Sequence, residues 1–129
     1  MSKLRKHSVA VVIPKGDSIL AVRRPDDDDE LPGVWGLPAG TCKSRETVED
    51  VIVRIGREKL GVDLKPVREL ASGSQDRSGY LLCMELWEVS MTGTPSHPNW
   101  RWVPVEFLRA GAAAGSFCCE LALNRQKPR

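Results

Sequence analysis

The chain has 129 residues, of which 41% are hydrophobic and 28% are charged, a composition that indicates one soluble globular domain over residues 1–129. Its formal net charge of +2 is too small to favour a protein that binds nucleic acid polymers. No apolar run approaches the roughly 20 residues that a membrane-spanning helix requires, so we expect no membrane partner.

The N-terminal third predicts two strands and a charged loop. Residues His7 to Pro14 and Ser18 to Arg24 are rich in β-branched side chains and flank a short turn, which indicates a hairpin. Residues Pro25 to Gly33 contain prolines and a run of aspartates, which is typical of a solvated loop. The segment Val34 to Gly40 is short and apolar, and we expect it to form a brief strand that leads into a tight loop.

The strongest predicted helix follows this loop. Ser44 or Thr47 can cap its N-terminus, and Gly61 is a typical C-terminal stop. Gly56 lies inside it and should cost about 1 kcal/mol relative to alanine. Apolar residues recur at helical spacing and predict a buried stripe, at Val48, Val51, Ile52 and Ile55.

The second half predicts strands around Val67 to Ala71 and over Tyr80 to Ser90, with a polar loop at residues 72–79 between them. A short strand ends at Pro104, and Ser116 to Gln126 are predicted to form a closing helix. Because helices and strands are mixed, the pattern favours an α/β or α+β fold.

The cysteines and the N-terminal sequence favour a cytoplasmic protein. No spacing typical of a zinc site occurs, which favours reduced thiols, at Cys42, Cys83, Cys118 and Cys119. The first apolar run is broken at residues 14–16 and no small-residue cleavage site follows it, so we expect no signal peptide.

Charged residues four apart share one face of the predicted helix, at Glu46, Asp50, Arg54 and Glu58. One interpretation is a solvated ladder of ion pairs. The other is a metal site, because the glycine loop before the helix can bring a backbone carbonyl close to a helix carboxylate, and Mg²⁺ prefers oxygen ligands.

The same stretch resembles the Nudix box, which has a glycine, five residues, a glutamate, seven residues, and then the pattern R-E-U-X-E-E-X-G-U, where U is a bulky aliphatic residue. The matching positions are Gly40, Glu46, Arg54, Glu58, Gly61 and Val62. The resemblance implies a Nudix-type α/β/α sandwich, with a mixed sheet between helices. It also implies Mg²⁺-dependent (or Mn²⁺-dependent) hydrolysis of a diphosphate linked to another moiety.

The box departs from the family pattern at its acidic positions. Ile55 stands where a glutamate follows the arginine, and Lys59 replaces the second of the paired glutamates. By the resemblance, the Ala39 carbonyl and Glu58 remain as metal ligands, and we expect a weakened metal site because two carboxylates are lost and one cation is gained. Three outcomes stay open: substitution by Glu46, Glu49 or Asp50 as ligands, a phosphate clamp by Lys59, or nucleotide binding without hydrolysis.

The predicted catalytic residues are Glu58, Arg54 and Glu46, with Asp50 as an additional metal ligand and Lys59 as a substrate contact. The resemblance makes Arg23 or Arg24 a phosphate contact, since guanidinium groups pair with phosphate in a bidentate manner. Trp35 or Trp100 can stack on a base.

We expect a hydrolase that cleaves the diphosphate linkage of a nucleoside polyphosphate or nucleotide-sugar-like molecule. The alternatives are a non-catalytic module that binds a nucleotide or a protein, and a plain structural domain. Because Nudix-like domains often dimerise, the resemblance also leaves a homodimer open.

Overall fold

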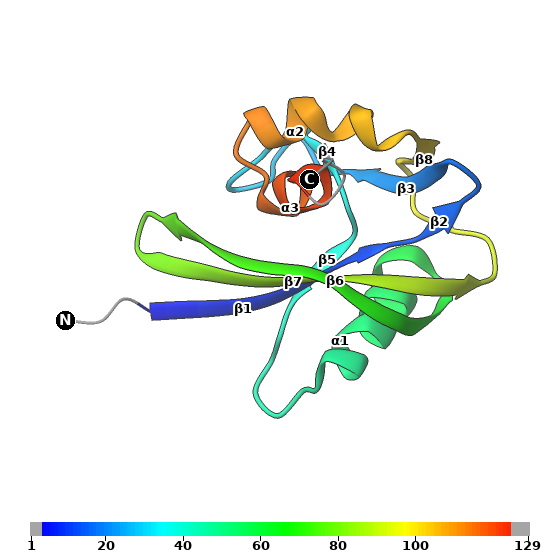
Figure 1. The fold of residues 1–129 in the computed structure, drawn as a ribbon, viewed down its shortest axis with the longest axis horizontal. Coiled ribbons are helices and arrows are strands. Elements are labelled where there is room, and N and C mark those ends of the chain that lie inside the picture. The colour runs from blue at the N-terminus through cyan, green and yellow to red at the C-terminus, as the bar shows by residue number, and fades with distance from the viewer. Residues whose placement is uncertain (1–3, 125–129) are drawn as a thin grey trace.

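A computed structural model of the protein describes residues 4–124, and Figure 1 shows its layers. The larger sheet has the strand order β5 (Ala39–Thr41), β1 (Leu4–Val12), β7 (Tyr80–Thr92) and β6 (Asp63–Arg77). The β1 and β7 strands are parallel, whereas the other neighbouring strands are antiparallel, so the sheet is mixed.

A second, smaller sheet is built around β3 (Ser18–Arg23). This strand pairs in antiparallel fashion with three short strands, namely β2 (Pro14–Lys15), β4 (Trp35–Gly36) and β8 (Trp100–Val103). The smaller sheet brings the segment around Arg23 next to the segment around Trp35 and next to Trp100, although these are distant in the sequence.

Helices cover both faces of the larger sheet. The α1 helix (Val48–Arg54) continues as the π-helical segment η1 (Ile55–Leu60) and lies on one face. The opposite face carries α3 (Phe117–Asn124), preceded by the 3₁₀ segment η2 (Val105–Leu108) and α2 (Arg109–Ala113). This arrangement confirms the predicted α/β/α sandwich.

The alternation of side chains along β1 explains the two layers of core. Val9 and Val11 pack with the apolar stripe of the central helix, whereas Ala10 and Val12 pack on the other face with the cluster that contains Phe117 and Leu121. Residues 8–12 are therefore buried from both sides. An interior strand of a covered sheet requires this apolar character on both faces.

The predicted hairpin is wrong in its first strand. Only Pro14 and Lys15 pair with the start of β3, while the preceding residues belong to the larger sheet, between β5 and β7. Because residues 9–12 are apolar on both faces of the strand, β1 is suited to the interior of the sheet. The chain leaves that sheet near Pro14, which has no backbone N–H to donate.

The predicted loop over residues 72–79 is also wrong. The β6 strand continues to Arg77 and pairs with β7 as far as Tyr80, which leaves only a short turn at residues 78–79. Most side chains of this stretch are exposed at the edge of the sheet, which accounts for its polar sequence, while its backbone is still paired.

The predicted limits of the central helix are confirmed at both ends. Thr47 caps the N-terminus, and Gly61 ends η1 in the left-handed conformation, with φ of 69°. The closing helix begins at Phe117, and the predicted residues 125–126 lie outside the described residues. No helix in the described part of the chain has the length and apolar character of a bilayer span.

Candidate functional site

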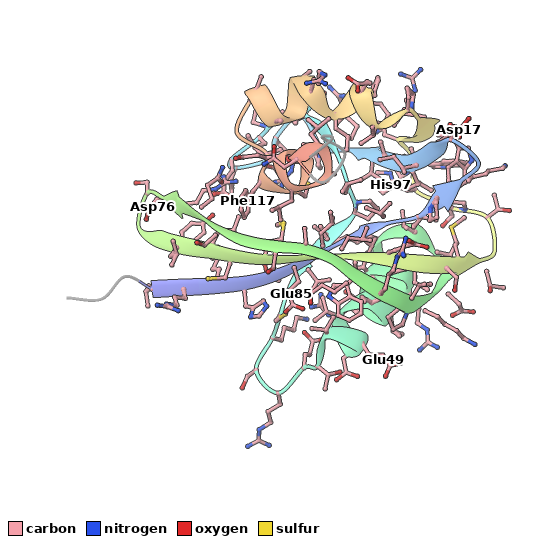
Figure 2. The ribbon with its side chains drawn as sticks, in the orientation of Figure 1. Asp17, Glu49, Asp76, Glu85, His97 and Phe117 are labelled. Carbon is pink, nitrogen blue, oxygen red and sulfur yellow. The ribbon has the colours of Figure 1, made fainter. Side chains whose placement is uncertain are left out.

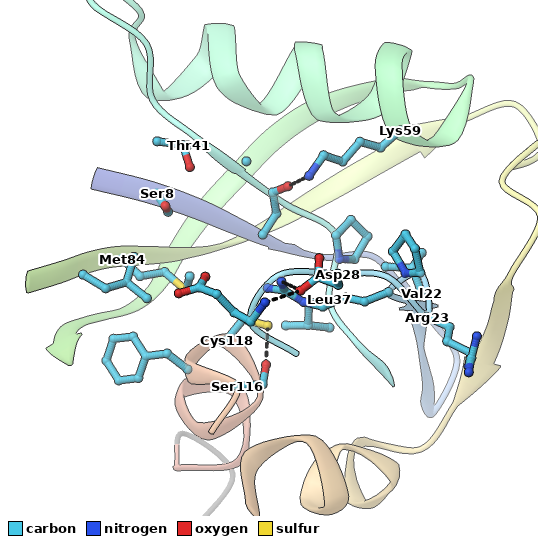
Figure 3. A pocket seen from close by; sticks show the side chains of 18 of the residues that line it. Ser8, Val22, Arg23, Asp28, Leu37, Thr41, Lys59, Met84, Ser116 and Cys118 are labelled. Carbon is cyan, nitrogen blue, oxygen red and sulfur yellow. Dashed lines mark hydrogen bonds and ion pairs between the residues drawn. The ribbon is translucent and has the colours of Figure 1, made fainter. Parts of the chain in front are cut away.

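A cavity of about 620 Å³ is lined by both sheets, by the end of η1 and by the start of α3. Figure 3 shows Ser8, Met84 and Leu37 around it, with Lys59 entering from the helical side. The charged residues of its wall include the cations Lys6, Arg23, Arg24, Lys59 and Arg77 and the anions Asp28, Glu30 and Glu58. The balance of these formal charges favours an anionic ligand.

The position of the cavity decides which helical residues reach it. It opens on the α3 face of the larger sheet, where Phe117 lies, whereas Glu85 points to the α1 face (Figure 2). Because β5 is the edge strand next to the central helix, the helix reaches the cavity only past this edge, through residues 58–60.

Lys59 contacts the backbone carbonyl that the sequence predicts as a metal ligand. Its ammonium group donates a hydrogen bond to the carbonyl oxygen of Ala39, the first residue of β5 (Figure 3). Desolvation lowers the pKa of Lys59, and the nearby charges of Arg24 and Arg54 lower it further. A cation that belongs to the chain therefore already occupies the position beside this oxygen.

The residues around this position do not fit a divalent metal ion. Among residues 4–124, no group of three or more His, Cys, Asp or Glu side chains is arranged to hold one. Glu58 lines the cavity but has no second carboxylate with it at the helix end, and the Ala39 carbonyl is already hydrogen-bonded to Lys59. Mg²⁺ requires several oxygen ligands in near-octahedral geometry, which this set does not supply.

Ile55 stands at the first of the missing glutamate positions and is fully buried in the core on the α1 side. A Cβ atom added to Gly40 would lie 3.2 Å from its Cγ1 atom. Glycine at position 40 therefore lets β5 approach the helix closely, and position 55 is an apolar packing position in this chain.

Arg54 and Glu46 form a structural ion pair on the α1 side. Arg54 Nε and one of its terminal nitrogens donate to the two carboxylate oxygens of Glu46, both at 2.9 Å, and the same nitrogen donates to the Thr41 carbonyl at 2.7 Å. The hydrogen bond from Arg54 lowers the pKa of Glu46 to about 2. Neither side chain lines the cavity.

The predicted ladder of pairs four residues apart is wrong. Glu46 precedes the helix and binds Arg54 eight residues later, while Asp50 takes part in a capping box with Thr47. The Asp50 carboxylate accepts from the Thr47 backbone at 3.0 Å, and the Thr47 hydroxyl accepts from the Asp50 backbone at 3.1 Å. Asp50 does not line the cavity, so its position gives no support to the predicted role as a metal ligand.

Both predicted arginines line the cavity. Arg23 pairs with Asp26 at 2.6 Å, and Arg24 pairs with Asp28 at 3.0 Å. Asp28 also accepts from the backbone of Leu31, and this bond is the main reason that its pKa is lowered. Part of the aspartate run therefore orients the two arginines, which the sequence pattern of a solvated loop did not indicate.

The predicted tryptophans lie outside the cavity wall. Trp35 packs edge-to-face against Phe107 at 5.8 Å between ring centroids, with the Arg101 guanidinium 5.4 Å from its ring. Trp100 packs against Trp102. The aromatic rings that line the cavity are those of Tyr80, Phe117 and His97.

The other end of the cavity holds a polar cluster that the sequence analysis missed. The Tyr80 hydroxyl donates to Glu30 at 2.6 Å, and Arg77 lies 3.6 Å from the same carboxylate oxygen. Along β1, Tyr80 is opposite Leu4 while Ala39 is opposite Ala10, so this cluster and Lys59 are about six residues apart along the sheet. The alternation in β7 was the available signal, because it places Tyr80 on the same face as Leu82 and Met84.

Comparison with known proteins shows which family has a similar sequence. The model of the NUDIX domain matches residues 4–117. A CTP pyrophosphohydrolase from Escherichia coli (strain K12) is 30% identical over 81 residues, which are 63% of this chain and 59% of that protein. An NAD-capped RNA hydrolase NudC from Stutzerimonas stutzeri (strain A1501) is 37% identical over 65 residues, which are 50% of this chain and 22% of that protein.

Solved structures show the same fold. The solution structure of the E. coli ORF135 protein matches with a TM-score of 0.78 and 26% identity, covering 95% of this chain and 91% of that chain. The crystal structure of MutT protein from Methanosarcina mazei Go1 matches with a TM-score of 0.74 at 18% identity, covering 85% of this chain and 84% of that chain, which supports the fold alone. Since the domain match extends over most of the sequence and agrees with the box around Gly40, Arg54 and Glu58, the chain belongs to the Nudix hydrolase family.

Proposed function

We propose that the chain binds a nucleoside polyphosphate or a nucleotide-sugar-like diphosphate in the cavity and hydrolyses its diphosphate linkage. The observation that carries this proposal is the presence of Arg23, Arg24 and Lys59 in the wall of one cavity that also contains Glu58. Guanidinium and ammonium groups bind phosphate oxygens through charge-assisted hydrogen bonds. A ligand with two linked phosphates can use several of these cations at once.

The relatives support the type of bond that is cleaved. One of them is named a CTP pyrophosphohydrolase, and the chain spans 59% of its length. The other named relatives act on NAD-capped RNA, and the chain spans 22% of their length. CTP and NAD are therefore suitable first substrates, and both contain a phosphoanhydride bond.

Glu58 is the residue we propose as the general base. In the reaction, a water oxygen bonds to phosphorus and a water proton passes to Glu58. The bridging P–O bond breaks, and its electron pair leaves with the oxygen of the departing phosphate group. CTP would give CMP and pyrophosphate, and NAD would give two monophosphates. Glu46 is a poor candidate because its pKa is about 2 and it lies outside the cavity. Because the donor set does not fit a divalent ion, we expect turnover to be slow.

A second function is favoured by the contact between Lys59 and the Ala39 carbonyl. This contact stabilises a cation that can hold a phosphate but cannot activate water by lowering its pKa as a metal does. The chain would then bind a nucleotide without cleaving it.

The two functions are separated by a turnover assay. The protein is incubated with CTP, NAD and nucleotide sugars, with EDTA or with Mg²⁺ or Mn²⁺, and product phosphates are measured by chromatography. Hydrolysis that is lost in Glu58→Gln supports the enzyme. A matched control is Glu69→Gln, since Glu69 is exposed and does not line the cavity.

Saturable binding with no product in any buffer would support the binding module instead. No binding and no turnover with any of these compounds would overturn both proposals for the cavity.

A further inference from the structure

We infer that the Lys59 ammonium group serves as the fixed positive charge that holds a diphosphate, so that this cavity binds diphosphates without a divalent cation. This inference rests on the proposed function, because it concerns the same ligand class and the same cavity. It concerns the departure of this chain from its family, in which the resemblance implies that a metal performs this task.

Lys59 lies where its ammonium group can reach a bound phosphate. Its ammonium group is hydrogen-bonded to the Ala39 carbonyl. Its backbone belongs to η1, directly after Glu58, so both ends of the side chain are fixed. An ammonium group has three N–H donors, and the Ala39 carbonyl accepts one of them. The cavity wall includes Lys59, so its remaining donors are available to phosphate oxygens.

The charges around Lys59 favour an anionic ligand over a divalent cation. Arg24 lines the same cavity wall as Lys59 and disfavours its charged form, so two cations lie close together at this end of the cavity. Arg54, on the α1 side outside the cavity, also disfavours the charged form of Lys59. An anion placed among them relieves this repulsion, whereas a divalent cation would add to it. Asp28 and Glu58 act in the opposite sense on Lys59, but more weakly than Arg24.

The residues at positions 55 and 59 both act against a metal at this site. A metal bound beside the Ala39 carbonyl would have to displace the Lys59 ammonium and would find one helix carboxylate, Glu58. Position 55 cannot supply another, since Ile55 is buried in the core. The substitutions at 55 and 59 therefore act together: one removes a ligand and the other inserts a cation.

Isothermal titration calorimetry with methylenediphosphonate, which cannot be hydrolysed, tests the inference. The wild-type protein, Lys59→Gln, Lys59→Arg and Lys65→Gln are titrated in EDTA and again in excess Mg²⁺. Lys65 is exposed on β6 and does not line the cavity, so it controls for the general loss of one positive charge. Circular dichroism and thermal melting verify that each variant is folded.

We expect the wild-type protein to bind in EDTA with an affinity that Mg²⁺ does not increase. Lys59→Gln should weaken binding by about tenfold to a hundredfold, as is typical for the loss of a hydrogen bond from a charged group, and Lys65→Gln should not. Lys59→Arg should retain most of the affinity, because it keeps the charge.

Binding that requires Mg²⁺ would overturn the inference while leaving the proposed function standing. Equal affinity of wild type and a folded Lys59→Gln in EDTA would overturn the role of Lys59. Absence of binding in both buffers would also overturn the inference, and the separate nucleotide assay would then decide whether the proposed function survives.

Discussion

Glu46 is held in one geometry by donors from two directions. Arg54 donates to both of its carboxylate oxygens, and the Lys43 backbone N–H donates to one of them at 2.7 Å. Arg54 in turn binds the carbonyl of Thr41. These bonds fix the loop between β5 and the helix, so this pair of box residues positions the backbone that leads from Ala39 to Glu58.

This geometry predicts that the free energy of unfolding falls at acidic pH as Glu46 takes up a proton. The pKa of Glu46 falls from an ordinary value of 4.5 to about 2 in the folded protein, chiefly through the hydrogen bond from Arg54. A depressed pKa contributes stability that is present above pH 4.5 and is lost as the pH falls towards 2. We expect urea unfolding of the wild type to show this loss, and Glu46→Gln to show a flatter profile over that range. Parallel profiles for the two proteins would contradict the assignment.

Lys59 predicts a pH dependence of ligand binding. Because its pKa is lowered by desolvation and by neighbouring cations, the ammonium form is lost at a lower pH than for an ordinary lysine, whose pKa is 10.5. Diphosphonate affinity measured in EDTA should therefore fall as the pH rises towards that value. Lys59→Arg is the matched control, because arginine keeps its proton and any remaining change reports the ligand's own titration. The same pH profile for both proteins would exclude Lys59 as the titrating group.

Ile55 predicts that restoring the family glutamate is costly. The side chain is fully buried among Val51, Leu60 and other apolar residues, and it lies where a side chain at Gly40 would have to go. An ionised carboxylate there lacks a described partner, so Ile55→Glu should destabilise the fold by about 3 kcal/mol or more, against about 1 kcal/mol for Ile55→Val. Chemical denaturation measures both values. A folded Ile55→Glu protein with unchanged stability would show that the side chain turns towards the cavity.

At the scale of elements, the limits of the central helix are set by its two end residues, and its packing on β6 depends on one glycine. The capping box at Thr47 and Asp50 begins it, and the left-handed Gly61 ends it. Between them, Gly56 lies where the helix crosses the start of β6. A Cβ atom at this position would lie 2.8 Å from both Leu64 Cγ and the Val62 carbonyl oxygen.

This crossing predicts that Gly56→Ala destabilises the protein, although alanine is the better helix former by about 1 kcal/mol. The added methyl group meets backbone that cannot easily move, and overpacking of this kind costs about 1–3 kcal/mol. Thermal and urea unfolding of Gly56→Ala measure the net effect. An increase in stability would mean that β6 shifts away from the helix at no cost.

The helix and the long strand β7 could be predicted because their signals are local. The limits and the buried face of the helix are set by residues within it or next to it, at Thr47, Val51, Ile55 and Gly61. The alternation from Tyr80 onward likewise lies within one strand. The end of β6 could not be predicted, since its polar residues 72–77 are held by backbone pairing with β7, a contact that depends on the partner strand. The position of β1 likewise depends on two other strands.

The predicted site residues that line the cavity come from the end of the box and from the arginines at the end of β3. Glu58, Lys59 and Ala39 meet there with Arg23 and Arg24. The helical period placed Glu46 and Asp50 on one face with Glu58, but it could not show that the helix passes the edge of β5 only at its final turn. Tyr80 and Arg77 are paired across the turn between β6 and β7, but Glu30 comes from a distant segment, and its contact with them depends on how the aspartate loop folds over the start of β7.

At the scale of the whole molecule, the cavity joins parts that are otherwise separate. Its wall takes residues from β1 and β7 of the larger sheet, from β3 of the smaller sheet, and from η1 and α3. A ligand seated there contacts both sheets at once. Its binding free energy should therefore stabilise the whole described fold rather than one loop.

This coupling predicts a large thermal shift that does not depend on metal. Methylenediphosphonate at a hundred times its Kd stabilises the native state by about 2.7 kcal/mol, which for a chain of this size corresponds to a Tm increase on the order of 10 °C. Differential scanning calorimetry in EDTA should show one transition that moves as a unit, because the ligand links the two sheets. Lys59→Gln at the same ligand concentration should move less, since its Kd is higher, while Lys65→Gln should follow the wild type. A transition that splits, with only one part shifted by the ligand, would show that the cavity does not couple the sheets. A shift that appears only when Mg²⁺ replaces EDTA would show that a metal ion, and not Lys59, holds the diphosphate.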